Sequence, residues 1–144
     1  MVFNRNKKFA KETEIVESLV RKLPKLAGKK NLSLEVFLVS DSEMKKINRK
    51  FKGKNRPTNV LSFEAEKGSL RPDLGSGRRF LGEIFLAPDY IRARGENIGF
   101  LFIHGFLHLL GYTHKGKRDR IRMEILEEEL CLKSLPGWIS ARPR

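Results

Sequence analysis

The stretch Ile103-His104-Gly105-Phe106-Leu107-His108-Leu109-Leu110-Gly111-Tyr112-Thr113-His114 contains all three histidines of the chain. The apolar residues in and before it have the length and composition of a buried helix. On a helix, residues four positions apart lie on one face, so the imidazoles of His104 and His108 can reach a common point. Gly111 is expected to end the helix, and the turn after it can bring His114 back toward the other two.

This pattern predicts a metal site formed by His104, His108 and His114. Three neutral imidazoles with a fourth position open to water are typical of a catalytic zinc site, whereas a structural site is closed by a fourth protein ligand. We therefore expect one divalent metal ion per chain, most simply zinc. The alternative is that the histidines bind no metal and are unrelated residues of the core and the surface.

The same offsets occur in zinc endopeptidases, which carry His-Glu-x-x-His followed by Gly-x-x-His. In those enzymes the residue after the first histidine is the general base of peptide hydrolysis. That residue is Gly105 here, so the general base of a protease is missing.

The composition indicates one domain, residues 1–144, that needs no disulfide bond. Cys131 is the only cysteine and falls in an apolar helical pattern. The net charge of +13 predicts attraction to polyanions, meaning nucleic acid or an anionic membrane surface. No apolar run approaches the ~18 residues of a membrane span, and the first residues lack the apolar core of a signal peptide. We expect a cytoplasmic protein.

Periodicity and turn residues predict a series of helices and strands. A short edge strand is expected at Val2-Phe3, and a helix over 9–23 that Pro24 stops. Strands are expected over 34–39, 60–63 and 80–86, a short helix over 89–94, and a mobile surface loop over 66–79. After the last helix, which Pro136-Gly137 ends, the tail over 136–144 is expected to be loose.

A basic helix is predicted after the capping box formed by Ser40 and Glu43. Met44, Ile47 and Phe51 mark its buried side, so Phe51 is expected in the core; the alternative is an exposed ring that stacks an RNA base. The segment 45–56 holds seven basic residues and no acidic one: Lys45, Lys46, Arg49, Lys50, Lys52, Lys54 and Arg56. Because Lys and Arg contacts to the backbone dominate nucleic-acid affinity, this segment predicts a phosphate-binding surface.

The last helix follows a second basic cluster that consists of Lys115, Lys117, Arg118, Arg120 and Arg122. Its apolar residues are expected to face the core: Ile121, Met123, Ile125, Leu126 and Leu130. Glu124 and residues 127–129 are expected on its outer side.

The chain resembles the YbeY family of bacterial metal-dependent endoribonucleases in two stretches. One is the histidine stretch, and the other is Pro57-Thr58-Asn59-Val60-Leu61-Ser62-Phe63. Leu81-Gly82-Glu83-Ile84 matches the family's Leu-Gly-Asp-Ile, and Met123 and Glu127 match Met-x-x-x-Glu in the last helix. The resemblance runs from about Asn48 to Leu130.

The resemblance implies an α+β domain with a small mixed sheet of about four strands and the metal-binding helix at its centre. It implies a single-strand-specific, metal-dependent endoribonuclease in ribosomal RNA maturation. Its partners would be single-stranded or ribosomal RNA and ribosomal particles, with no membrane.

Three residues depart from the family pattern. Lys52 replaces the usual arginine, Thr113 replaces the aspartate before the third histidine, and Glu83 replaces the aspartate of Leu-Gly-Asp-Ile. The stretch between the strand and the histidine helix is also about a dozen residues shorter than usual.

In an endoribonuclease, Lys52 could act as a catalytic residue by neutralising charge on the phosphorane oxygens. Glu83 and Glu64 are the carboxylates to examine as proton carriers. Two other functions stay open at this point: a zinc metalloprotease, and a non-enzymatic RNA- or ribosome-binding protein with a structural metal.

Overall fold

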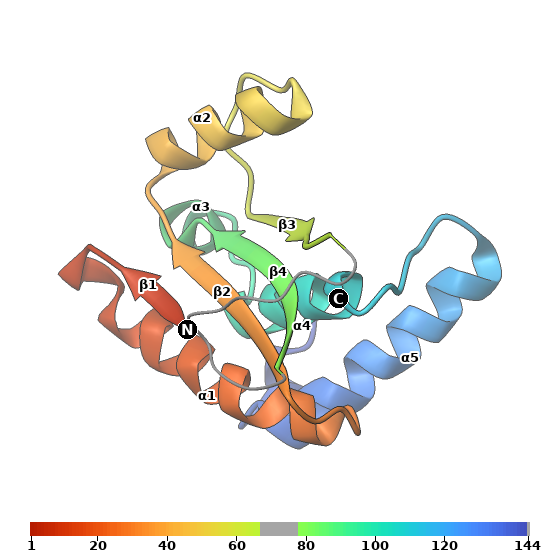
Figure 1. Cartoon of the computed structure of the whole chain (residues 1–144). Coiled ribbons are helices and arrows are strands. Elements are labelled where there is room, and N and C mark those ends of the chain that lie inside the picture. The colour runs from red at the N-terminus through yellow and green to blue at the C-terminus, as the bar shows by residue number, and fades with distance from the viewer. Residues whose placement is uncertain (67–77, 144) are drawn as a thin grey trace.

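Four strands form one mixed sheet in the order β1-β2-β4-β3 (Figure 1). The computed structural model describes residues 1–66 and 78–143. The strands are β1 (Val2–Asn4), β2 (Leu32–Leu38), β3 (Val60–Glu64) and β4 (Arg79–Leu86). β1 and β4 both pair with β2 in parallel, and β3 pairs with β4 in antiparallel orientation at the edge. The prediction of a mixed four-stranded sheet is confirmed.

The helices fill the connections between these strands. They are α1 (Ala10–Leu26), α2 (Asp41–Lys52), α3 (Pro88–Ala93), α4 (Ile98–Leu109), α5 (Lys117–Ser134) and α6 (Trp138–Ala141), with a 3-10 turn at Lys7–Phe9. α4 packs against β3, β4, α1 and α5, so the predicted helix containing the first two histidines is the centre of the α+β domain. Within residues 1–66 and 78–143, no helix combines the length and apolar character that a membrane span requires.

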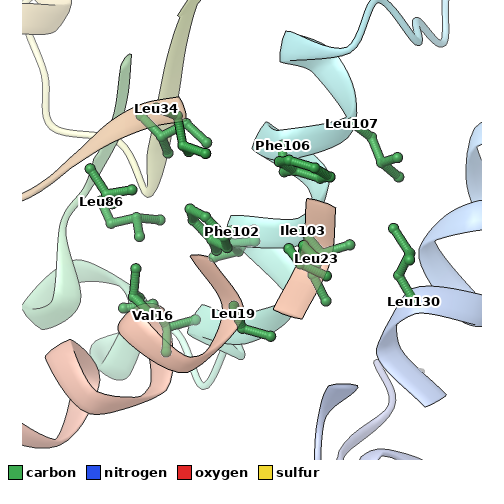
Figure 2. Packing of buried hydrophobic residues seen from close by; sticks show 14 of the residues in the cluster. Val16, Leu19, Leu23, Leu34, Leu86, Phe102, Ile103, Phe106, Leu107 and Leu130 are labelled. Atoms are coloured by element: carbon green, nitrogen blue, oxygen red, sulfur yellow. The ribbon is translucent and has the colours of Figure 1, made fainter. Parts of the chain in front are cut away.

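The main hydrophobic core surrounds α4, because this helix is apolar on nearly every side. Figure 2 shows Phe102 and Phe106 of α4 among side chains of the sheet and α1, while Leu107 points toward Leu130 of α5. Both phenylalanines are completely buried, and truncating a buried phenylalanine to alanine typically costs about 3–5 kcal/mol. This packing holds the helix that carries His104 and His108 in a fixed position.

A smaller core lies on the other face of the sheet, where α2 packs. Met44 of α2 is buried there against Leu61 of β3 and Ala87. The predicted capping box is present in part, because the Ser40 hydroxyl accepts a hydrogen bond from the backbone N–H of Glu43 at 3.2 Å. Gly53 ends the helix with a φ of 70°, a left-handed conformation that suits glycine.

Pro24 does not stop the first helix, contrary to the prediction. It lies inside α1, which continues to Leu26. A proline so close to the C-terminus removes only one helical hydrogen bond, and the turns after it remain closed. The backbone N–H of Lys29, for example, donates to the Pro24 carbonyl at 2.8 Å.

The expectation of a loose tail over 136–144 is wrong at Trp138. This residue is 3% exposed, and its ring stacks on Phe100 of α4 with centroids 5.6 Å apart. Its indole N–H donates to Glu128 at 3.1 Å. An aromatic anchor therefore holds α6 against the core, although the flanking segment has the composition of a loop.

Three apolar residues that the periodicity assigns to the core are exposed: Phe51, Ile121 and Ile125. Helical spacing indicates which residues share a face but not how much of that face a neighbour covers. The predicted mobile loop falls mainly on residues 67–77, which lie outside the described residues.

Candidate metal centre

α4 and the turn after it bring the three histidines together, as predicted. His104 and His108 lie one helical turn apart, and α4 ends at Leu109. Gly111 then reverses the chain with a φ of 102°, and the backbone N–H of Tyr112 donates back to the Leu107 carbonyl at 3.0 Å. This closed turn sets the position of His114.

The Nε2 atoms of the three imidazoles form a nearly equilateral triangle. They are 3.0 Å apart between His104 and His108, and 3.1 Å from each of these to His114. Two nitrogens bound at tetrahedral positions about 2.0–2.1 Å from zinc are ~3.3–3.4 Å apart, so the triangle is a few tenths of an ångström tighter than a zinc site. The three histidines are positioned to bind one metal ion.

The tautomer of His108 supports metal binding. Its Nδ1 atom lies 3.0 Å from the Tyr112 carbonyl, and a carbonyl only accepts hydrogen bonds. The proton is therefore on Nδ1, and Nε2 has a free lone pair that points at the other two imidazoles. Lone pairs that face one another at about 3 Å repel each other, and a cation bound between them would remove this repulsion by accepting the lone pairs.

His104 is oriented by Glu127 of α5. The carboxylate Oε1 lies 2.8 Å from Nδ1 of His104, so it accepts the Nδ1 proton and leaves Nε2 free for a metal. Glu127 is only 6% exposed, and its placement on the outer side of the last helix is therefore wrong. Its spacing to the buried Met123 and Leu130 is helical, and this period could have identified it as an inward-facing residue.

Burial lowers the pKa of His108, and the neighbouring His104 lowers it further. The hydrogen bond to the Tyr112 carbonyl acts in the opposite direction but does not reverse the shift. A lowered pKa keeps this imidazole neutral at pH 7, which is the form that binds metals.

The site is open on one side. His114 is exposed and the other two histidines are partly exposed. In the described part of the chain, no other histidine, cysteine or carboxylate joins these three as a potential ligand. Three ligands with an open position are characteristic of a catalytic metal site rather than a structural one.

Gly105 marks a close contact between α4 and the sheet. A Cβ atom at this position would lie 2.9 Å from Oγ of Ser62 in β3 and 3.4 Å from Cδ1 of Ile84 in β4. A longer side chain would therefore enter the helix–sheet interface instead of reaching the histidines. The glutamate of zinc endopeptidases does not fit at this position, which argues against peptide hydrolysis by their mechanism.

Lys52 is exposed at the end of α2, with its Nζ atom 5.6 Å above the centre of the Phe63 ring. Within the described residues, no hydrogen bond or ion pair joins it to the histidines. The other predicted RNA-binding residues are exposed as well, and no ion pair within the described residues neutralises them. They are Lys45, Lys46, Arg49, Lys50, Lys54 and Arg56. The structure thus keeps this basic surface free but does not bring Lys52 into contact with the metal centre.

Glu83 and Glu64, the two candidate proton carriers, lie on opposite faces of the sheet. Ser62 and Ile84 are register partners that face α4, and Glu83 alternates with Ile84 along β4. Glu83 therefore lies on the face of the sheet that points away from the histidines. Glu64 shares the face of Ser62 and is exposed, and no hydrogen bond to its carboxylate occurs among the described residues.

Thr113 replaces the aspartate of the family pattern, and its hydroxyl donates to Asp119 at 3.4 Å. Asp119 lies in the first turn of α5. A carboxylate is therefore still present beside the turn that carries His114, although it comes from a different residue.

The comparisons with known proteins agree with this geometry. The family model described as "Endoribonuclease YbeY" matches residues 2–135. A protein named endoribonuclease YbeY from Francisella tularensis subsp. mediasiatica is 38% identical in an alignment of length 123 residues, and the match covers 78% of this chain and 75% of that protein. Its namesake from Francisella philomiragia subsp. philomiragia is 39% identical in an alignment of length 116 residues, and the match covers 73% of each chain.

Among solved structures, the solution structure of TM1509 from Thermotoga maritima is similar over 99% of this chain and 94% of that chain. The TM-score is 0.52 and the sequence identity is 25%. Both the sequence and the arrangement of helices and strands thus agree with the resemblance that the histidine stretch and residues 57–63 indicated. The chain belongs to the endoribonuclease YbeY family.

Proposed function

We propose that this protein is a metal-dependent endoribonuclease that cleaves single-stranded RNA and acts in the maturation of ribosomal RNA in the cytoplasm. The observation that carries the proposal is the triangle of Nε2 atoms from His104, His108 and His114, open on one side. Membership of the endoribonuclease YbeY family supports RNA as the substrate. The net charge of +13 supports a polyanionic partner, including ribosomal particles.

Zinc is the ion that we propose for this site, because three imidazoles with an open position suit it. A divalent ion held there would supply Lewis-acid chemistry, either by polarising a phosphoryl oxygen or by lowering the pKa of a water molecule. Glu127 and the Tyr112 carbonyl hold two imidazoles in the tautomer that such an ion requires.

The remaining task is to bind the RNA and to stabilise its charge. The exposed basic residues 45–56 would hold the phosphates. Lys52, which lies over Phe63 of the edge strand β3, would stabilise negative charge at the scissile phosphate of an RNA that passes around this edge. Two facts support this role for Lys52: no ion pair within the described residues occupies its ammonium group, and it corresponds to the position of the family's arginine. A lysine keeps the charge but lacks the planar pair of donors that a guanidinium offers.

The test is cleavage of purified ribosomal RNA by wild type and by His108→Ala, each measured after chelation and after re-addition of single divalent metals. We expect cleavage by metal-loaded wild type only, and preference for a single-stranded fragment over the same sequence in a duplex. Elemental analysis of both proteins would identify the ion. RNA that stays intact with fully metal-loaded wild type would contradict the proposal.

Two controls separate the rival functions. Circular dichroism of the chelated protein should be unchanged, whereas unfolding on chelation would indicate a structural metal. Casein should not be cleaved by the metal-loaded protein, because Gly105 provides no general base.

A further inference from the structure

Five phenylalanine rings form a continuous row across the face of the sheet that points away from α4. They come from β1, β2, β4, β3 and the end of α2, in the spatial order Phe3, Phe37, Phe85, Phe63 and Phe51. The distances between successive ring centres are 4.9, 4.8, 5.8 and 5.2 Å. The first three rings are stacked face to face, so both faces of the middle ring, Phe37, are occupied.

Phe51 differs from the rings in the middle of this row. It is 59% exposed, but its ring leans on Phe63 at an angle of 59°, and Phe63 in turn packs edge-on against Phe85. The exposed ring of Phe51 is therefore supported on one side by Phe63, and the flexible side chain of Lys50 lies over it. A single exposed phenylalanine needs no explanation by itself, so its surroundings decide what it can do.

Those surroundings are cationic. The Nζ atom of Lys50 lies 5.3 Å from the centre of the Phe51 ring, and Lys52 lies over Phe63. A cavity of about 480 Å³ opens next to Lys52, and Lys54 and Arg56 also line it. Its lining includes these three basic side chains and no acidic one among the described residues. Phe51 does not line this cavity, but its chain neighbour Lys52 does. An exposed ring next in the chain to a basic cavity matches the two parts of a nucleotide, a base and a phosphate.

The position of this surface relative to the metal centre is also informative. Both are built on the edge strand β3, where Phe63 contacts Phe51 and the preceding Ser62 lies against Gly105, the neighbour of His104. The two surfaces thus lie on opposite faces of one edge strand. A flexible single strand could bend around this edge, whereas a stiff duplex could not.

We propose that Phe51 stacks on one base of the RNA substrate while Lys54 and Arg56 hold the adjoining phosphate in the cavity. The inference rests on the proposed endoribonuclease function and adds a reason for its selectivity. Bases in a duplex are stacked on each other and have no free face, so the surface selects single strands.

The test measures binding of a short fluorescent oligouridine by anisotropy, in the presence of a chelator that prevents metal-dependent cleavage. Phe51→Leu keeps the apolar bulk but removes the ring, and Phe51→Trp restores a larger one. We expect Phe51→Leu to weaken binding by about 5- to 100-fold, the usual effect of losing one base–aromatic stack, and Phe51→Trp to bind like wild type. Phe3→Leu, at the other exposed end of the row, is the matched control and should bind like wild type.

A second ligand isolates the base from the phosphates. A chain of abasic sugar-phosphate units of equal length carries the same charge, and Phe51→Leu and wild type should bind it equally. The inference is overturned if Phe51→Leu binds oligouridine as tightly as wild type, or if it weakens binding to both ligands equally. In either case wild type would still cleave RNA, which distinguishes this failure from a failure of the proposed function.

Discussion

The carboxylate of Glu127 lies 2.8 Å from Nδ1 of His104 and joins α5 to the metal centre on α4. The two residues are 23 positions apart in the chain, and the glutamate is almost completely buried. A buried carboxylate that accepts the Nδ1 proton both orients the ring and makes Nε2 a stronger ligand. The last helix therefore has a direct part in the site, although it contributes none of the three ligands.

Glu127→Gln should lower metal affinity by about 10- to 100-fold, the usual effect of losing a carboxylate that orients a ligating histidine. Competition with a chromophoric chelator measures the affinity. Glu124→Gln is the control, because Glu124 lies on the exposed side of the same helix and should have no effect. Equal affinities for all three proteins would mean that the carboxylate has a structural role only.

If the ammonium group of Lys52 stabilises charge in the transition state, Lys52→Ala should raise the activation free energy of cleavage by about 2–4 kcal/mol when RNA is saturating. Lys52→Arg should preserve or raise the rate, because a guanidinium keeps the charge and adds a second parallel hydrogen bond. Single-turnover cleavage at matched metal content measures both rates. A Lys52→Ala enzyme as fast as wild type would exclude Lys52 from the chemistry.

The basic surface of α2 should determine the salt dependence of RNA binding. Each phosphate contact adds about −0.7 to the slope of log affinity against log salt concentration for a single strand. Reversing two charges with Lys46→Glu and Arg49→Glu should therefore flatten the slope by about 1 to 2. The matched control reverses Lys117 and Arg120 of the second basic cluster. If only the control flattens the slope, the RNA follows α5 instead of α2.

Gly105→Glu should destabilise the fold without producing a protease. The Cβ atom alone would approach Oγ of Ser62 to 2.9 Å, and overpacking of this kind typically costs about 1–3 kcal/mol. Urea denaturation measures the change in the free energy of unfolding. Gly116→Glu is the control, because nothing lies within 4 Å of a Cβ atom at position 116. A Gly105→Glu protein of wild-type stability would show that the helix–sheet contact can relax.

Cys131 should be inert toward alkylation in the folded protein. Burial raises the pKa of its thiol to about 12, and the carboxylates of Glu127 and Glu128 add to this shift. Because the folded pKa lies above the ordinary value of 9.0, the thiol's contribution to stability is present below pH 9 and is lost as the pH rises toward 12. Mass spectrometry after iodoacetamide treatment at pH 8.5 should find Cys131 unmodified in buffer and modified in urea. Rapid modification of the native protein would mean that α5 opens locally.

The sequence alone determined the features that depend on neighbours in the chain. The spacing of His104 and His108, and the turn at Gly111, place three imidazoles together because a helix and its C-terminal turn have fixed local geometry. The strands and the start of α2 at Ser40 were predictable for the same reason.

Only the tertiary structure decided which faces of these elements are covered. It buries Glu127 beside His104, exposes Phe51 on the row of rings, and anchors Trp138 in a segment that resembles a loose tail. Periodicity identifies the side of a helix on which a residue lies, but the contact itself depends on residues far away in the chain. The packing of α5, β3 and α6 around α4 brings those residues together, and no local pattern specifies this packing.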